Sequence, residues 1–119
     1  MEAAEVIAAL SALAQETRLG IYRLLVQAGP QGLPAGEIAD RLGLPSPTLS
    51  FHLAQLKHAG LVGQRRHGRS IIYAANYARM NGLVGYLTEN CCQGQADYRG
   101  ARCEAAAEPV LSTRRSDSP

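Results

Sequence analysis

Three cysteines near the C-terminal end are the side chains of this 119-residue chain best suited to chemistry. Cys91 and Cys92 are adjacent, and Cys103 follows after a segment that contains two glycines. Three soft thiolates with no imidazole nearby suit a soft, three-coordinate ion such as As(III) or Sb(III), whereas Zn(II) usually takes four ligands. The sequence therefore predicts a metalloid site made by Cys91, Cys92 and Cys103, and it indicates no organic cofactor.

The adjacency of Cys91 and Cys92 limits how such a site can form. Neighbouring residues of an α-helix point about 100° apart, so both thiols reach one ion only where a helix frays or ends. Other interpretations remain open: three unremarkable thiols, or a redox switch in which Cys91 or Cys92 bonds to Cys103. An enzyme with a cysteine nucleophile, such as an arsenate reductase, needs an oxyanion cradle and an acid partner. The segment Gln93-Gly94-Gln95 offers only a weak cradle, and the sequence shows no acid partner. No enzymatic activity is expected.

The stretch from Ser46 to Gly60 is predicted to form a helix around which the chain is organised. The Ser46 hydroxyl suits an N-cap, Pro47 suits the first helical position, and Gly60 suits the left-handed residue that ends a helix. The inward face is formed by leucines at helical spacing, namely Leu49, Leu53 and Leu56. The outward face, with Ser50 and Phe51, is small and nearly uncharged. Such a face suits the major groove of DNA, although an ordinary amphipathic helix is the alternative.

A positive block surrounds this helix. No Asp or Glu occurs from Arg41 to Thr88, and the cations of this stretch are Arg41, Lys57, Arg65, Arg66, Arg69 and Arg79. Phosphate contacts require such charges, because each neutralised phosphate releases counterions. The alternative is a solvated basic surface.

Hydrophobic periodicity predicts three helices before the central one. The first covers residues 3–14, and its stripe is Val6, Leu10 and Leu13, widened by Ile7 and Ala14. The second ends by Gly29-Pro30, and its stripe is Leu19, Tyr22, Leu25 and Val26. The third is short: Pro34 opens it, Ile38 and Leu42 face inward, and Gly43 closes it. The third and central helices with their glycine-containing turn make a helix-turn-helix pattern.

A β-hairpin is predicted after the central helix. Its strands are Leu61–Arg66 and Ser70–Ala74, joined at 67–69. Two strands alone are marginal in water, so the hairpin must lean on the helices. Its tip carries cations placed to reach phosphates or a minor groove, with a solvent-exposed tip as the alternative. The fold class is therefore mainly α with a β-hairpin, a winged helix-turn-helix.

Composition sets the remaining boundaries. The length allows one small core, which we place in residues 1–92, with 93–119 as a loop that completes the thiol site and a disordered tail. The odd number of cysteines argues for reduced thiols rather than a disulfide framework. The acidic first residues and the lack of a long apolar run predict a cytoplasmic protein without a membrane partner.

Five motifs in order resemble the ArsR/SmtB family of winged-helix metalloregulatory repressors. They are residues 12–19 (ALAQETRL), 37–43 (EIADRLG), 49–53 (LSFHL), 56–62 (LKHAGLV) and 66–69 (RHGR). The resemblance implies a homodimer that binds double-stranded operator DNA near its own promoter and leaves when a toxic ion binds. It also implies that the first and last helices pair across the dimer axis, through Tyr77, Met80, Val84 and Leu87 with Val6 and Leu10. The positions that face bases in the family match Ser46, Pro47, Ser50 and Phe51.

The family's usual ion sites are missing from this sequence. The third helix has no Cys-x-Cys pair, and residues 77–89 hold no His and only Glu89 as a carboxylate. The pair Cys91-Cys92 instead resembles a subgroup of arsenite-responsive members with sites at the end of the last helix. The expected function is thus an As(III)- or Sb(III)-responsive repressor, with a redox switch or a Zn(II)/Cd(II)-responsive repressor as alternatives. The candidate DNA contacts are Ser46, Pro47, Thr48, Ser50, Phe51, His52, Arg65, Arg66 and Arg69.

Overall fold

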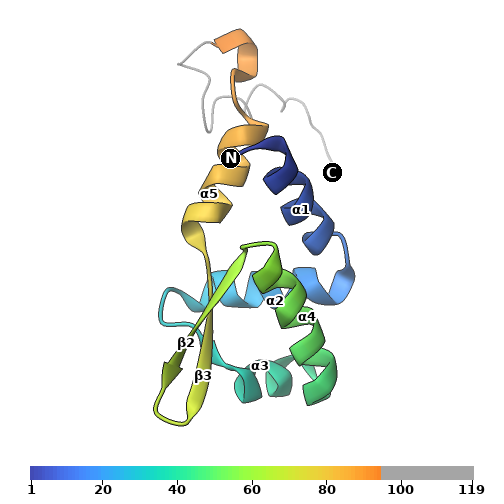
Figure 1. Cartoon of the computed structure of the whole chain (residues 1–119), viewed down its shortest axis with the longest axis vertical. Helices are drawn as coiled ribbons and strands as arrows, with labels where there is room; N and C mark the ends of the chain where they lie inside the picture. Colours follow the sequence, from blue (N-terminus) through green and yellow to red (C-terminus); the bar gives the residue numbers. More distant parts are fainter. Residues whose placement is uncertain (95–119) are drawn as a thin grey trace, which may run out of the picture. The chain divides into compact units, whose positions relative to one another are not determined.

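The computed structural model describes residues 1–94, with side chains to residue 92, and the whole chain divides into two compact units, 1–86 and 87–119. The elements of Figure 1 are α1 (Ala3–Leu13), α2 (Glu16–Ala28), β1 (Leu33–Pro34), α3 (Ala35–Leu42), α4 (Ser46–His58), β2 (Val62–His67), β3 (Ser70–Ala75), α5 (Tyr77–Leu87) and a short 3-10 helix (Cys91–Gly94). No helix within residues 1–94 combines the length and the apolar character needed to cross a bilayer. The predicted fold class, helices with a β-hairpin wing, is confirmed.

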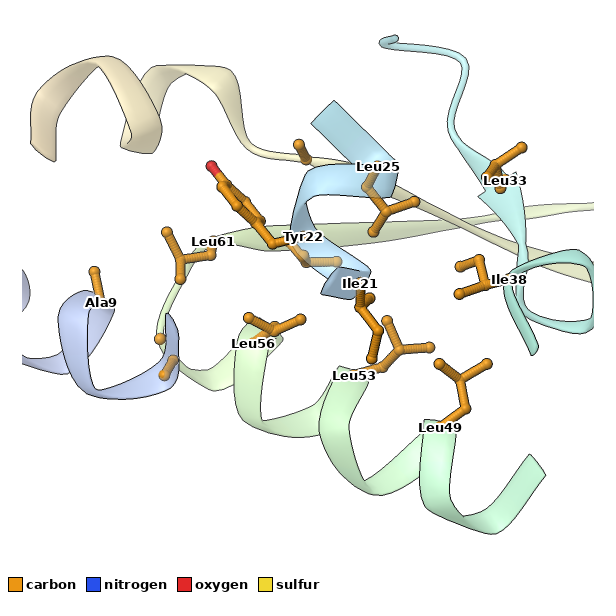
Figure 2. Packing of buried hydrophobic residues seen from close by; sticks show 14 of the residues in the cluster. Ala9, Ile21, Tyr22, Leu25, Leu33, Ile38, Leu49, Leu53, Leu56 and Leu61 are labelled. Carbon is orange, nitrogen blue, oxygen red and sulfur yellow. The ribbon is translucent and has the colours of Figure 1, made fainter. Parts of the chain in front are cut away.

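The hydrophobic core of the first unit is centred on α2. Ile21 and Leu25 are fully buried between α4, α3 and the hairpin, as Figure 2 shows. The other large side chains that are fully buried are Ile38, Leu49, Leu53, Leu56 and Leu61. Burying one such side chain contributes about 1.5–3 kcal/mol, so this set fixes how α3 and α4 sit on α2.

The buried face of α1 differs from the predicted stripe. Val6, Ala9 and Ala12 are buried, whereas Ile7 and Leu10 are 64% and 42% exposed. Alanine lets α1 approach α2 and α4 closely, and spacing of three residues keeps the small side chains on one face. The prediction gave too much weight to large side chains, and the exposed Ile7 and Leu10 are left without cover in the protomer.

Two further inward assignments were wrong. Leu19 of α2 is 44% exposed, because Ile21, Tyr22 and Leu25 form the buried face instead. Leu42 of α3 is 36% exposed, and its expected place is taken by Ala39 beside Ile38. The end of α3 is as predicted, since Gly43 adopts the left-handed conformation with φ 64°.

The hairpin belongs to a three-stranded antiparallel sheet with the order β1-β3-β2. The sequence did not reveal β1, which pairs Leu33 with Tyr73 and Pro34 with Ile72. Gly32 makes this pairing possible, because its φ is 72° and a Cβ there would lie 2.2 Å from the Tyr73 carbonyl oxygen. The third strand anchors the hairpin to the helices, which is the support that a lone hairpin lacks.

Tyr22 gives a test of the core. Its hydroxyl is buried and makes no hydrogen bond within the described part of the chain, and burial, then Tyr77, raises its pKa. We expect Tyr22→Phe to increase the free energy of unfolding by up to about 1–3 kcal/mol, because an unsatisfied buried group is removed. Urea unfolding at pH 7 measures the change.

The matched control is Tyr77→Phe. The Tyr77 hydroxyl donates a 2.8 Å hydrogen bond to the Val26 carbonyl oxygen, so its loss should cost about 1 kcal/mol.

The raised pKa of Tyr22 makes the stability of the protein depend on pH. The free energy of unfolding that is linked to the protonated Tyr22 hydroxyl is complete below the unfolded-state pKa of about 10, and it is lost as pH rises through the folded-state pKa. Tyr22→Phe should abolish this alkaline loss. A destabilised Tyr22→Phe protein would show that the hydroxyl has a partner in solution.

Candidate DNA-binding surface and thiol site

The helix-turn-helix is built by α3, a short turn and α4. Gly43 ends α3, and the N-cap of α4 is Pro45, which has no side-chain hydrogen bond to the helix. The predicted cap was therefore one residue late: Ser46 is the first helical residue and Pro47 the second, where a missing N–H costs nothing. Gly60 ends the segment with φ 81°, as predicted. The Ser46 hydroxyl is thus not used as the cap.

The two faces of α4 are as the leucine spacing predicted. Leu49, Leu53 and Leu56 are all fully buried, with at most 2% of each residue exposed. Most candidate reading residues on the other face are exposed, namely Ser46, Pro47, Thr48, Ser50 and Phe51. His52 is half-buried. Phe51 is 58% exposed, an unusual state for the only phenylalanine of the chain. This face offers hydroxyls and an apolar ring, which are groups that contact base edges and thymine methyls.

Arg18 orients His52, and the sequence did not indicate this. The Arg18 Nε donates to the carbonyl oxygen of Ala12 over 2.7 Å, and its Nη1 lies 3.4 Å from the Nδ1 of His52. A guanidinium only donates, so Nδ1 accepts and a neutral imidazole carries its proton on Nε2. Arg18 and His52 are 34 residues apart, and no local pattern links them.

The wing supplies cations at the exposed hairpin. Arg65, Arg66 and Arg69 are all exposed, as a phosphate-binding role requires. The Nη2 of Arg65 donates to the carbonyl oxygen of Gln31 over 2.8 Å, so this side chain also supports its own protomer. Figure 1 shows the hairpin tip at the end of the unit where α3 lies and α4 begins. The reading face and the wing cations can therefore address one duplex.

The candidate thiol site begins after the last helix has ended. α5 stops at Leu87, and Cys91 and Cys92 lie in the 3-10 helix, half-buried and exposed respectively. Asn90 and Cys92 have left-handed backbones, with φ 58° and 54°. The two thiols are therefore not held on adjacent positions of a regular α-helix, which is the condition for both to face one ion.

Cys103 lies outside the described residues, so the three-thiol site stays a prediction. Within residues 1–94, no three His, Cys, Asp or Glu side chains come together as metal ligands. The imidazoles of His52, His58 and His67 belong to α4 and β2.

Exposed apolar side chains mark α1 and α5. They are Ile7, Leu10, Val84 and Leu87, each at least 42% exposed. Two residues expected in the dimer contact have other roles: Val6 is buried in its own protomer, and the Tyr77 hydroxyl binds α2 through Val26. A contact between copies would thus use Ile7 and Leu10 on α1.

The chain is similar to several known transcriptional regulators. A sequence profile described as "Helix-turn-helix domain" matches residues 13–65. The transcriptional activator HlyU of Vibrio cholerae is 32% identical over 90 residues, which is 76% of this chain and 81% of that protein. An ArsR-like transcriptional regulator from Rhodococcus sp. RHA1 is structurally similar, with a TM-score of 0.67, 29% identity and coverage of 92% of this chain and 96% of that one.

A further solved structure is a homodimer. It is the winged helix-turn-helix DNA-binding domain of a possible ArsR-family regulator from Mycobacterium bovis, with a TM-score of 0.57 and 30% identity. The match covers 77% of this chain and 85% of that domain. These similarities agree with the five sequence motifs, the helix-turn-helix and the wing. The chain belongs to the ArsR/SmtB family of winged helix-turn-helix transcriptional regulators.

Proposed function

We propose that this regulator is a homodimeric repressor that binds operator DNA and dissociates when As(III) or Sb(III) binds Cys91, Cys92 and Cys103. The observation that carries the proposal is the position of Cys91 and Cys92 just beyond the end of α5. Thiolates are the ligands that soft ions prefer, and this part of the chain offers no competing imidazole.

The reading half of the proposal rests on α4 and the wing. Ser50 and Phe51 lie on the exposed face of α4, where they would meet base edges, and Arg66 and Arg69 would meet phosphates. A homodimer places two copies of α4 about one helical turn apart on DNA, so a palindromic site is expected.

One prediction separates base contacts from phosphate contacts. Ser50→Ala should weaken specific binding by about 1–3 kcal/mol without changing the salt dependence. Arg69→Ala should weaken specific and non-specific binding alike and reduce the salt slope by about 1. Fluorescence anisotropy at several salt concentrations measures both. An unchanged slope for Arg69→Ala would remove the wing tip from the DNA contact.

Release requires that the ion change the spacing of the two reading helices. An ion that draws Cys91 and Cys92 together must alter the backbone after α5, where two residues already have left-handed conformations. Allosteric couplings are typically about 1–3 kcal/mol, roughly 5–150-fold in affinity. By linkage, operator DNA must weaken metalloid binding by the same factor.

The test is a titration of a labelled operator duplex and reduced protein with four ions. As(III) and Sb(III) should release the DNA at lower concentrations than Zn(II) and Cd(II). Release by Zn(II) or Cd(II) alone would contradict the metalloid assignment. Release by an oxidant with no metalloid present would instead indicate the thiol redox switch.

A further inference from the structure

The turn that ends α4 is held by two residues from the start of α5. Asn76 is the N-cap of α5, since its Oδ1 accepts a 3.1 Å hydrogen bond from the Arg79 backbone N–H. The Nδ2 of the same side chain donates to the Gly60 carbonyl oxygen over 3.0 Å. The Asn76 backbone N–H donates to the Leu61 carbonyl oxygen over 2.8 Å. One residue thus binds the ends of two helices.

Arg79 contacts the same turn through its guanidinium. A Cβ built on Gly60 would lie 2.8 Å from the Nη2 and 2.9 Å from the Nε of Arg79, so the guanidinium rests directly on the glycine. The Nη1 of Arg79 lies 3.5 Å from the Oε2 of Glu5 in α1. The Glu5 carboxylate also accepts a hydrogen bond from the Glu2 backbone N–H. This hydrogen bond, and then the charge of Arg79, lower the pKa of Glu5, so the carboxylate stays charged.

Glycine is required at position 60 for two reasons that arise independently. Its φ of 81° is a conformation that side chains with a Cβ rarely adopt, and the space where a Cβ would lie is filled by Arg79. The backbone of the turn closes α4, since the Gly60 N–H donates to the Lys57 carbonyl oxygen and the Leu61 N–H to that of Leu56. The C-terminal end of α4 therefore has one position relative to the start of α5.

We propose that Asn76 and Arg79 are positioning residues for DNA binding, which fix the orientation of α4 by holding Gly60 at the start of α5, while Arg79 is itself held by Glu5 of α1. Neither residue contacts DNA in this proposal. They act by keeping the exposed face of α4 at one angle in each protomer, so that both copies enter the groove together. The inference rests on the proposed reading role of α4 and does not depend on which ion is the inducer.

The experiment uses a labelled duplex selected from random DNA by the wild-type protein. Asn76→Ser keeps a capping hydroxyl for α5 but cannot reach Gly60, and Arg79→Ala removes the guanidinium. Each change should weaken binding by about fivefold or more, at the lower end of typical couplings, with an unchanged salt slope. The DNA affinity of the double variant should be about equal to that of the single variant that binds more weakly, because both substitutions act through one turn. Arg23→Ala, on the exposed side of α2, is the matched control and should bind as the wild type does.

Affinities are compared at a temperature at which circular dichroism shows every variant to be folded. Wild-type affinity in both single variants would overturn the proposal. A salt slope lowered by about 1 in Arg79→Ala would also overturn it, because Arg79 would then contact a phosphate. If Arg79→Ala does not fold, the affinity of Asn76→Ser decides: weakened binding supports the proposal, and wild-type affinity overturns it. Failure of the wild-type protein to select any duplex would contradict the proposed function itself, so the two failures are distinct.

Discussion

Cys91→Ser and Cys92→Ser proteins should bind operator DNA with wild-type affinity and remain bound when As(III) is added. The reason is that both thiols lie beyond α5, outside the α4 face and the hairpin that we assign to DNA. A serine hydroxyl is a poor ligand for a soft ion, so the coupling of about 5–150-fold between ion and operator should disappear. Release of a labelled operator duplex during As(III) titration measures the loss.

The third thiol and a matched control complete this test. Cys103→Ser should give a partial or equal loss of response, which decides whether Cys103 is a required ligand. The control is Asn90→Gly, which changes the residue before the thiol pair, keeps its left-handed backbone accessible and should respond to As(III) as the wild type does. If all three serine variants release DNA at wild-type As(III) concentrations, the ion acts elsewhere in the chain.

Leu87→Glu should convert the dimer into monomers that no longer hold two half-sites. Leu87 is 59% exposed, and in a two-fold dimer each substituted copy would lose about 1.5–3 kcal/mol of apolar burial and gain a charge without a partner. The dissociation constant of the dimer should therefore rise at least about 100-fold. Analytical ultracentrifugation measures it.

A second helix and a control make the dimer test specific. Ile7→Glu, on α1, should have the same effect, because Ile7 is 64% exposed. Leu42→Glu changes a leucine that is 36% exposed on α3, outside the proposed contact, and should leave the dimer intact. A Leu87→Glu protein that sediments as a dimer would place the contact on other residues.

The parts of the fold that are set by local patterns could be predicted. The spacing of Leu49, Leu53 and Leu56 identified the buried face of α4, and Gly43 identified the end of α3. The hairpin followed from β-prone runs around Gly68, although β2 begins at Val62 rather than Leu61 and includes His67, and β3 extends to Ala75. These features depend on helical periodicity and on the backbone freedom of glycine, and both can be read from the order of the residues.

The parts that depend on contacts between distant residues could not be predicted. The strand β1 is only two residues long and exists because Leu33 and Pro34 pair with β3. In α1, the alanines Ala9 and Ala12 are buried for the close approach they allow, while hydropathy favoured Leu10. The contact of Arg18 with His52 likewise has no local signature, because it depends on how α2 meets α4.

The strand order of the sheet has a consequence for solubility. In the order β1-β3-β2, β2 is an edge strand, and five of its six residues are exposed. An edge of this kind is a template on which another chain can add a strand, and charged side chains are a common protection against such growth. Arg65 and Arg66 lie on this edge, so we expect the charges that we assign to phosphate binding also to hinder the addition of another strand. The wing of a regulator released from its operator would need these charges most.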